Sequence, residues 1–307
     1  MTPHSDTRNR LKKNGLFDHL AHVATVGRYL EILAWGKSLV KQQGNEVSLY
    51  NGARLTLPGQ MMGLGKELLR HGIHEPSATR LYEGFLEPGE RIFEAGANIG
   101  YYISVAERVL GGNVTFLAVE PDPEVFQTLG QNVGSIKNRI HVEQLAVSDS
   151  SGEIPFFQSA SSNLGSIRRS RRTDDRALIV ETKTIDNLCE FHNFHPSFLR
   201  MDIEGAEIFA LRGAKMVLAN LRPKIFMELH PQLMSGEELS EIFEILRAND
   251  YRTLTIVDRS YDSPTALRFL KRAQPRTLDI DQLEALLNER YFTALGVFSR
   301  SVFKGLS

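Results

Sequence analysis

The chain has 307 residues, of which 42% are hydrophobic and 24% charged, and its formal net charge at pH 7 is -1. These values are ordinary for a globular protein with a full hydrophobic core. The balanced charge gives no indication of a nucleic-acid partner.

Targeting features are missing from the sequence. No segment approaches the roughly 18 apolar residues of a membrane span, and the polar, basic residues 1–15 lack the apolar core of a signal peptide. The single cysteine, Cys189, excludes an internal disulfide and suits a reducing compartment; its helical setting predicts a buried thiol. We therefore expect a cytoplasmic protein.

The first part of the chain predicts helices and a hairpin. Residues 1–45 begin as a polar segment and continue as an amphipathic helix, which could dock on the core, on a partner subunit or on a membrane surface. Residues 47–58 alternate around Asn51-Gly52, which indicates a hairpin. A helical pattern follows from Leu64 to Phe85 and breaks at His71-Gly72. We expect residues 86–307 to form the main domain. Residues 1–85 should form an extension that caps this domain, docks on it or binds the molecule on which the protein acts.

The stretch from Arg91 to Pro123 reads as an apolar strand, a glycine turn, a helix and a second apolar strand. Gly96 and Gly100 allow a tight turn and let a ligand approach the amides at the start of the helix. Glu120 follows about 20 residues later, at a strand end, where an acid can hold ribose hydroxyls. We expect a nucleoside-bearing cofactor here; the alternative is a turn kept only for packing.

The rest of the chain alternates between helix and strand patterns. Expected helices cover residues 123–133, 206–212 and 236–249, and another begins near Thr184. Expected strands cover residues 140–145, 198–201, 224–230, 252–257 and 293–299. Residues 152–157 suggest a hairpin arm, and the chain returns to a strand from residue 177. This alternation predicts an α/β fold with a mainly parallel sheet and helices on both faces.

Six motifs follow one another along the chain: Phe93 to Tyr102, Val119 to Pro121, Ala146 to Asp149, Thr184 to Asp186, Asp202 to Glu207 and Met227 to His230. In sequence and order they resemble the motifs of the FkbM family of S-adenosylmethionine (SAM)-dependent methyltransferases. The resemblance covers roughly residues 90 to 232, and its most specific part is the Asp-x-Glu-Gly-Ala-Glu element. The resemblance implies a Rossmann-like class I methyltransferase fold with seven strands. Glu94 departs from the family, which more often has aspartate there.

The resemblance also implies a SAM site at the carboxyl ends of the first strands, as is general for open parallel sheets. Glu120 would hold the ribose hydroxyls, and Asp149 would accept from the adenine amino group beside the backbone of Ala146 and Val147. The residues implied at the methionine end and the glycine turn are Glu94, Gly96, Asn98, Gly100 and Tyr101. Glu120 could instead be a solvated strand end, and Asp149 a turn former.

A second group of residues is suited to work on the methyl acceptor: Asp202, Glu204, Glu228 and His230. Glu228 and His230 point to the same side of their strand because side chains alternate with a period of two. These groups could ease removal of the acceptor proton directly. Alternatively, Asp202 and Glu228 could hold a divalent cation such as Mg²⁺. Glu204 could also be a helix-start acid, and His230 could merely end a strand.

The expected function is methyl transfer from SAM to oxygen on a sugar, a glycolipid or a natural product. An NAD-dependent oxidoreductase is the alternative enzyme, but the turn lacks the third glycine of G-x-G-x-x-G and the chain has no Tyr-x-x-x-Lys dyad. A non-catalytic protein that binds SAM or a nucleotide is the alternative outside enzymes. The acceptor's identity and the formation of a homo-oligomer stay open.

Two further groups of basic residues need interpretation. Arg168, Arg169, Arg171 and Arg172 fall in the loop-like residues 158–176. They could grip an anionic acceptor, because guanidinium groups form a planar fork, or they could be a solvated charge run. The pairs His71/His74 and His192/His195 lack nearby partners at metal-site spacing and are interpreted as surface histidines.

Overall fold

The computed structural model describes residues 45–58, 63–158, 165–168, 176–258, 276–289 and 294–299. The helix expected within residues 1–45 lies almost entirely outside these ranges. The described part contains a central sheet in the order β12-β11-β13-β10-β9-β3-β4-β5. Its strands are β12 (Arg276–Asp279), β11 (Thr253–Asp258), β13 (Ala294–Ser299), β10 (Lys224–Leu229), β9 (Phe198–Met201), β3 (Glu90–Ala95), β4 (Val114–Val119) and β5 (Ile140–Glu143).

The central sheet is mainly parallel, as predicted. Strands β5, β4, β3, β9 and β10 run in one direction, and β13 pairs antiparallel with both β10 and β11. The sheet has eight strands in the described ranges, so the expected count of seven is not confirmed. The additional strand, β12, pairs only with β11 at the outer edge and comes from a segment without an alternating pattern.

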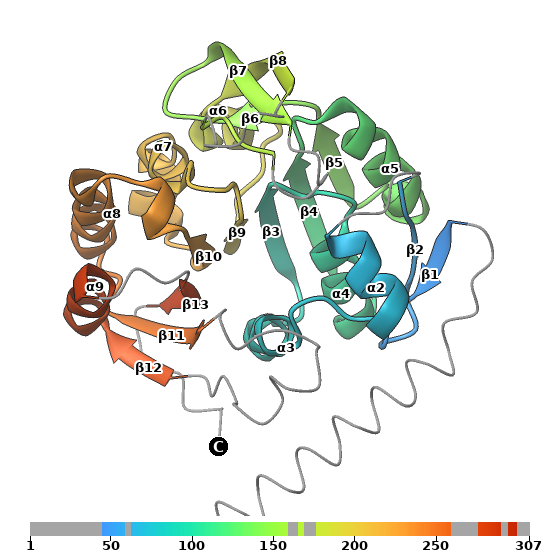
Figure 1. Ribbon diagram of the computed structural model, residues 1–307, viewed down its shortest axis with the longest axis horizontal. Helices are drawn as coiled ribbons and strands as arrows, with labels where there is room; N and C mark the ends of the chain where they lie inside the picture. Colours follow the sequence, from blue (N-terminus) through green and yellow to red (C-terminus); the bar gives the residue numbers. More distant parts are fainter. Residues whose placement is uncertain are drawn as a thin grey trace, which may run out of the picture.

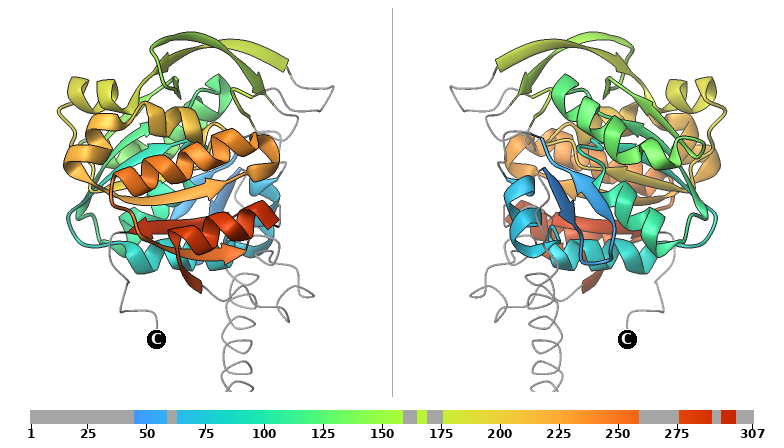
Figure 2. Two further views of the ribbon diagram at one scale, coloured as in Figure 1. Left: turned by 90° about the vertical axis from the view of Figure 1, so that its left-hand side faces the viewer. Right: turned by 90° about the vertical axis from the view of Figure 1, so that its right-hand side faces the viewer.

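Helices cover both faces of the sheet (Figures 1 and 2). One face carries α2 (Leu64–His71), α3 (Pro76–Phe85), α4 (Tyr101–Val109) and α5 (Pro123–Val133); the other carries α6 (Ile185–Phe191), α7 (Glu207–Arg212), α8 (Gly236–Ala248) and α9 (Ile280–Glu289). Cys189 of α6 is buried, as predicted. Within the ranges given above, no helix is long and apolar enough to cross a membrane.

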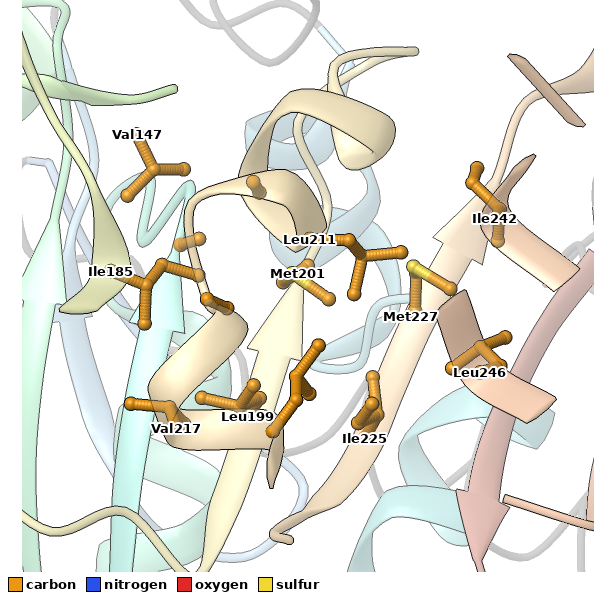
Figure 3. Packing of buried hydrophobic residues seen from close by; sticks show 14 of the residues in the cluster. Val147, Ile185, Leu199, Met201, Leu211, Val217, Ile225, Met227, Ile242 and Leu246 are labelled. Atoms are coloured by element: carbon orange, nitrogen blue, oxygen red, sulfur yellow. The ribbon is translucent and has the colours of Figure 1, made fainter. Parts of the chain in front are cut away.

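Two apolar cores hold these layers together. Figure 3 shows the core on the α6–α9 face, where side chains of β9 and β10 pack against those of α7 and α8. Leu199, Met201, Ile225 and Met227 are fully buried there. Each such side chain contributes roughly 1.5–3 kcal/mol by leaving water. Because side chains alternate along a strand, Leu199 and Met201 face helices α6–α9, whereas Arg200 between them points to the other face of the sheet.

The segment before the central sheet packs into the second core. Strands β1 (Glu46–Ser48) and β2 (Arg54–Thr56) form the predicted hairpin around Asn51-Gly52, and Val47 and Leu55 are buried with α4 and α5. Asn132 of α5 ties the hairpin down. Its Oδ1 accepts the Thr56 N–H (2.7 Å), and its Nδ2 donates to the carbonyl oxygens of Thr56 (3.0 Å) and Ile99 (2.7 Å).

A smaller sheet lies across the end of the central sheet (Figures 1 and 2). It contains β6 (Ala146–Val147), β8 (Arg176–Lys183) and β7 (Gly152–Gln158), with β7 and β8 antiparallel. The predicted arm is therefore present. The chain then enters α6 through Thr184, whose hydroxyl accepts the Asn187 N–H (3.0 Å) as an N-cap.

Candidate active site

A cleft opens at the carboxyl ends of β3, β4 and β9, where the strand order reverses. This is the position at which open parallel sheets bind ligands. The space within the cleft is about 950 Å³ when its open mouth is included. The predicted site residues that line it are Gly96, Asn98, Tyr101, Glu120, Ala146, Val147, Asp202 and Glu204.

The glycine turn is shaped by a close backbone contact. Gly96 has a φ of 75°, and a Cβ there would lie 2.3 Å from the Asp202 carbonyl oxygen. Any other residue would therefore push the turn and the end of β9 apart. Gly100 precedes α4 with a φ of 85° and faces Leu129, so it supports the turn without lining the cleft.

Glu120 lies at the cleft floor and is 6% exposed. Its Oε2 accepts the Asn98 N–H (2.8 Å) and its Oε1 accepts the Asp122 N–H (3.0 Å). Burial raises the pKa of Glu120 to about 7, although these two backbone donors oppose the shift. Each carboxylate oxygen keeps a second acceptor site, so the group can still hold two ligand hydroxyls.

The wall beside Glu120 differs in part from the expectation. Ala146 and Val147 line it together with Asp122 and Phe156, which the sequence did not single out. Asp149 is not among the lining residues; its carboxylate lies 3.7 Å from Nη1 of Arg212.

Arg200 is a cleft residue that sequence reasoning missed. Its Nη1 donates to Oε1 of Glu94 (2.8 Å), its Nη2 to Oδ2 of Asp202 (3.2 Å), and its guanidinium stacks 4.0 Å from the ring centre of Tyr102. Glu94 is buried and does not line the cleft. Burial raises the pKa of Glu94 to about 7, against the opposing charge of Arg200. The period of two that places Arg200 beside Asp202 was the signal available in the sequence.

The residues predicted to work on the acceptor form a cluster around His230. Nε2 of His230 lies 3.2 Å from Oε1 of Glu228 and 3.5 Å from Oε2 of Glu204. Its Nδ1 lies 3.4 Å from Oε1 of Glu207. Glu228 and His230 are buried beneath the cleft wall that Asp202 and Glu204 form.

The surroundings within the cluster change the pKa values of His230 and Glu228. Burial lowers the pKa of His230, but the contacts with Glu207 and Glu228 outweigh it, so the net pKa is well above the ordinary value. Burial raises the pKa of Glu228 to about 6, with further contributions from the charges of Asp202 and Glu75. The structure therefore brings the four predicted acceptor-side residues together.

Comparison with known proteins identifies the family to which this chain belongs. Residues 94–253 match the family model described as the methyltransferase FkbM domain, which is more than half of the chain. The chain belongs to the FkbM methyltransferase family. The resemblance drawn from the motifs is thus confirmed, and the oxidoreductase alternative has no support.

The methyltransferase also resembles individual proteins. It is 25% identical over 187 residues to the hexuronic acid methyltransferase AglP of Haloferax volcanii, a match that covers 58% of this chain and 75% of that one. Methyltransferase FkbM from Methylobacillus flagellatus shares 18% identity at a TM-score of 0.47; the match covers 90% of this chain but only 60% of that structure's length. TYW2 of M. jannaschii, solved in complex with AdoMet, shares 12% identity at a TM-score of 0.40, over 85% of this chain and 89% of that one.

The segment before the family match contributes to the cleft of the methyltransferase. His74 lines the cleft beside Leu64 and is largely buried, so its interpretation as a surface histidine was wrong. Its Nδ1 lies 2.6 Å from Oε2 of Glu67, and its Nε2 lies 3.6 Å from Oε1 of Glu75. Tyr101 clamps the loop, because its hydroxyl accepts the His74 N–H (3.1 Å).

The connection between β7 and β8 also reaches the cleft of the methyltransferase. Ser166 lines the wall, and its hydroxyl donates to the Glu204 carbonyl oxygen (2.9 Å). Arg168 donates to Oε1 of Glu238 (2.6 Å) and to the Leu233 carbonyl oxygen (3.2 Å). Arg168 is therefore half-buried and not solvated. Arg169, Arg171 and Arg172 lie outside the described residues.

Proposed function

We propose that this methyltransferase uses SAM to methylate a hydroxyl oxygen of an acidic sugar, as a free molecule or within a glycan. The observation that carries SAM use is the placement of Glu120 at the end of β4, opposite the turn at Gly96 and Asn98. An acid in this place, facing a glycine turn, is the arrangement that holds a nucleoside ribose.

The residues present fit SAM. Glu120 keeps acceptor sites for two ribose hydroxyls. Val147 and Phe156 offer apolar surface for a nucleobase, and the glycine turn lines the cleft through Gly96 and Asn98. When bound, SAM would supply an electrophilic methyl group on a positively charged sulfur.

The residues at the acceptor end suit removal of a proton. Asp202 and Glu204 line the cleft, and Glu228 and His230 lie directly behind them. A hydroxyl becomes a better nucleophile when a carboxylate takes its proton as the methyl group is transferred. Holding the hydroxyl against Asp202 or Glu204 also fixes its direction of attack. Proton removal and orientation both require an acceptor group that carries a proton, as a hydroxyl does.

The choice of an acidic sugar is supported by the relative AglP, whose name specifies a hexuronic acid. Such a sugar has two kinds of oxygen that can be methylated. A carboxylate oxygen has no proton to lose at neutral pH, whereas a hydroxyl does. The carboxylates at the acceptor end favour the hydroxyl, and hence a methyl ether as the product.

The test uses SAM with an isotopic label in its methyl group and two probes, methyl glucuronoside and methyl glucoside. We expect S-adenosylhomocysteine (SAH) to form with the glucuronoside, and the labelled product to survive mild base as an ether does. Release of the label by base would indicate a methyl ester and contradict the hydroxyl assignment. Binding of SAM without turnover on any sugar acid would favour the non-catalytic alternative.

A further inference from the structure

The geometry points to a divalent-cation site formed by Asp202, Glu228 and Nε2 of His230 at the acceptor end of the cleft. One ligand atom from each residue can be chosen so that all lie within 4.8 Å of one another. Two ligands at about 2.1–2.2 Å from one ion can be at most about 4.4 Å apart. The three ligand atoms are thus close to the separations that one ion requires, and modest side-chain movements would bring them into its coordination shell.

The surroundings of His230 carry the proposal beyond a group of acids. His230 is 2% exposed, and neither of its ring nitrogens has a hydrogen-bond partner among the described residues. Nε2 nevertheless faces Glu228 and Glu204 at 3.2 and 3.5 Å. A buried imidazole nitrogen that faces carboxylate oxygens without hydrogen-bond geometry is arranged as a co-ligand of the same ion would be.

The other nitrogen of His230 faces a carboxylate, which is the kind of group found behind metal-binding histidines. Metal-bound histidines generally direct their second ring nitrogen at a carboxylate or carbonyl, which fixes the tautomer and the ring orientation. Nδ1 of His230 lies 3.4 Å from Oε1 of Glu207, a fully buried carboxylate. That oxygen is held in turn by the Gly205 N–H (3.2 Å). Glu207 is thus a positioning residue for His230.

The charge around the cluster also favours a cation. Arg200 is engaged by Glu94 and Asp202. His230 faces three carboxylates, those of Glu204, Glu207 and Glu228. Buried carboxylates are stabilised by cations, whether these are side chains or metal ions.

The ligand set indicates which ion. Two carboxylates and an imidazole suit Mn²⁺, Fe²⁺ or Zn²⁺ better than Mg²⁺ or Ca²⁺, which prefer oxygen ligands throughout. An ion here would lower the pKa of an acceptor hydroxyl. This catalytic role rests on the proposed function, whereas the binding of the ion does not.

The test is titration of the chelator-stripped, full-length protein with Mn²⁺ alone, followed by calorimetry and electron paramagnetic resonance (EPR). We expect one tightly bound Mn²⁺ per chain. Asp202→Asn, Glu228→Gln and His230→Gln should each weaken binding at least tenfold, and Glu207→Gln about 10- to 100-fold. Glu153→Gln removes the same charge from an exposed position on β7 and should leave binding unchanged.

Circular dichroism establishes that each variant is folded. A measurement on the unmodified protein does not depend on whether the variants fold. Pulsed EPR of Mn²⁺ bound to it should detect the coupling of one imidazole nitrogen. Failure of the unmodified protein to bind Mn²⁺, Fe²⁺ or Zn²⁺, or a bound ion without nitrogen coupling, would overturn the site. SAH calorimetry on the same sample tests the proposed function separately, because it requires neither ion nor acceptor.

Discussion

The backbone amide of Asn98 donates a 2.8 Å hydrogen bond to Oε2 of Glu120. This bond joins the turn after β3 to the end of β4, two elements that the chain reaches 22 residues apart. Because the donor belongs to the backbone, the orientation of the Glu120 carboxylate is fixed before any ligand arrives. Such preorganisation reduces the entropy that binding must offset.

Replacement of Glu120 should therefore weaken SAM binding strongly. Glu120→Ala removes the proposed acceptor of two ribose hydroxyls and should cost about 1–3 kcal/mol, or roughly 5- to 150-fold in affinity. Calorimetry with SAH measures the change. Glu143→Ala is the matched control, since Glu143 ends the neighbouring β5 and contacts His192 instead (2.8 Å). Equal affinity in wild type and Glu120→Ala would remove Glu120 from the site.

SAM affinity should depend on pH through Glu120. Its pKa in the free protein is raised to about 7, so the neutral form is populated at pH 7 and dominates at pH 6. The carboxylate accepts hydroxyl hydrogen bonds better than the acid, so affinity should rise from pH 6 to pH 8 and then level off. SAH calorimetry at pH 6, 7 and 8 measures this. Glu120→Gln should bind more weakly with a flatter profile; identical profiles would contradict the assignment.

The buried pair of Arg200 and Glu94 should matter for folding. Arg200→Met leaves the Glu94 carboxylate without its cation and should lower the free energy of unfolding by about 3–5 kcal/mol. The pKa of Glu94 is already about 7, above its unfolded value, and should rise further in the variant. As pH rises through this pKa, the buried carboxyl must ionise without a cation beside it, so the variant loses stability. The difference in unfolding free energy between wild type and Arg200→Met should therefore be larger at pH 8.5 than at pH 6.

Urea unfolding at the two pH values measures that defect. The double variant Arg200→Met with Glu94→Gln removes both charges and should recover stability at pH 8.5. A defect in Arg200→Met that is independent of pH would indicate lost packing against Tyr102 instead.

His74 should act on the acceptor and not on SAM. It lines the cleft from outside the family match, and Glu67 holds its Nδ1. His74→Gln should lower kcat/KM for the sugar acid about tenfold or more while SAH affinity stays within twofold. His192→Gln is the matched control, because His192 contacts Glu143 away from the cleft. Equal kinetics for both variants would make His74 a structural residue.

Much of the fold could be predicted because the signals are local. The Asn51-Gly52 turn, the Thr184 cap and the alternating strands each depend on neighbouring residues, and each is present. Strand β12 was missed because it is short, polar and mostly exposed, so its pairing with β11 leaves little trace in the sequence. Helix α9 was missed although its buried residues Ile280, Leu283 and Leu287 recur at helical spacing.

The site was predicted less completely because its residues meet only through folding. Glu120 and Asp202 could be placed from strand ends alone. His74, Phe156 and Arg200 come from a loop, from the arm and from a strand interior, and no spacing links them. Asp149 shows the opposite case, since it follows a strand as expected but contacts Arg212.

One side-chain amide gives the protein a remote reporter of its cleft. The side-chain nitrogen of Asn132 donates to Thr56 of the hairpin and to Ile99 of the glycine turn, and its side-chain oxygen accepts the Thr56 N–H. Any ligand that steadies the turn must therefore slow opening at Thr56. Deuterium uptake at the Thr56 amide should fall when SAH is added, and Asn132→Ala should abolish that response. A fall in uptake would mean that the hairpin responds to occupancy of the cleft without touching the ligand.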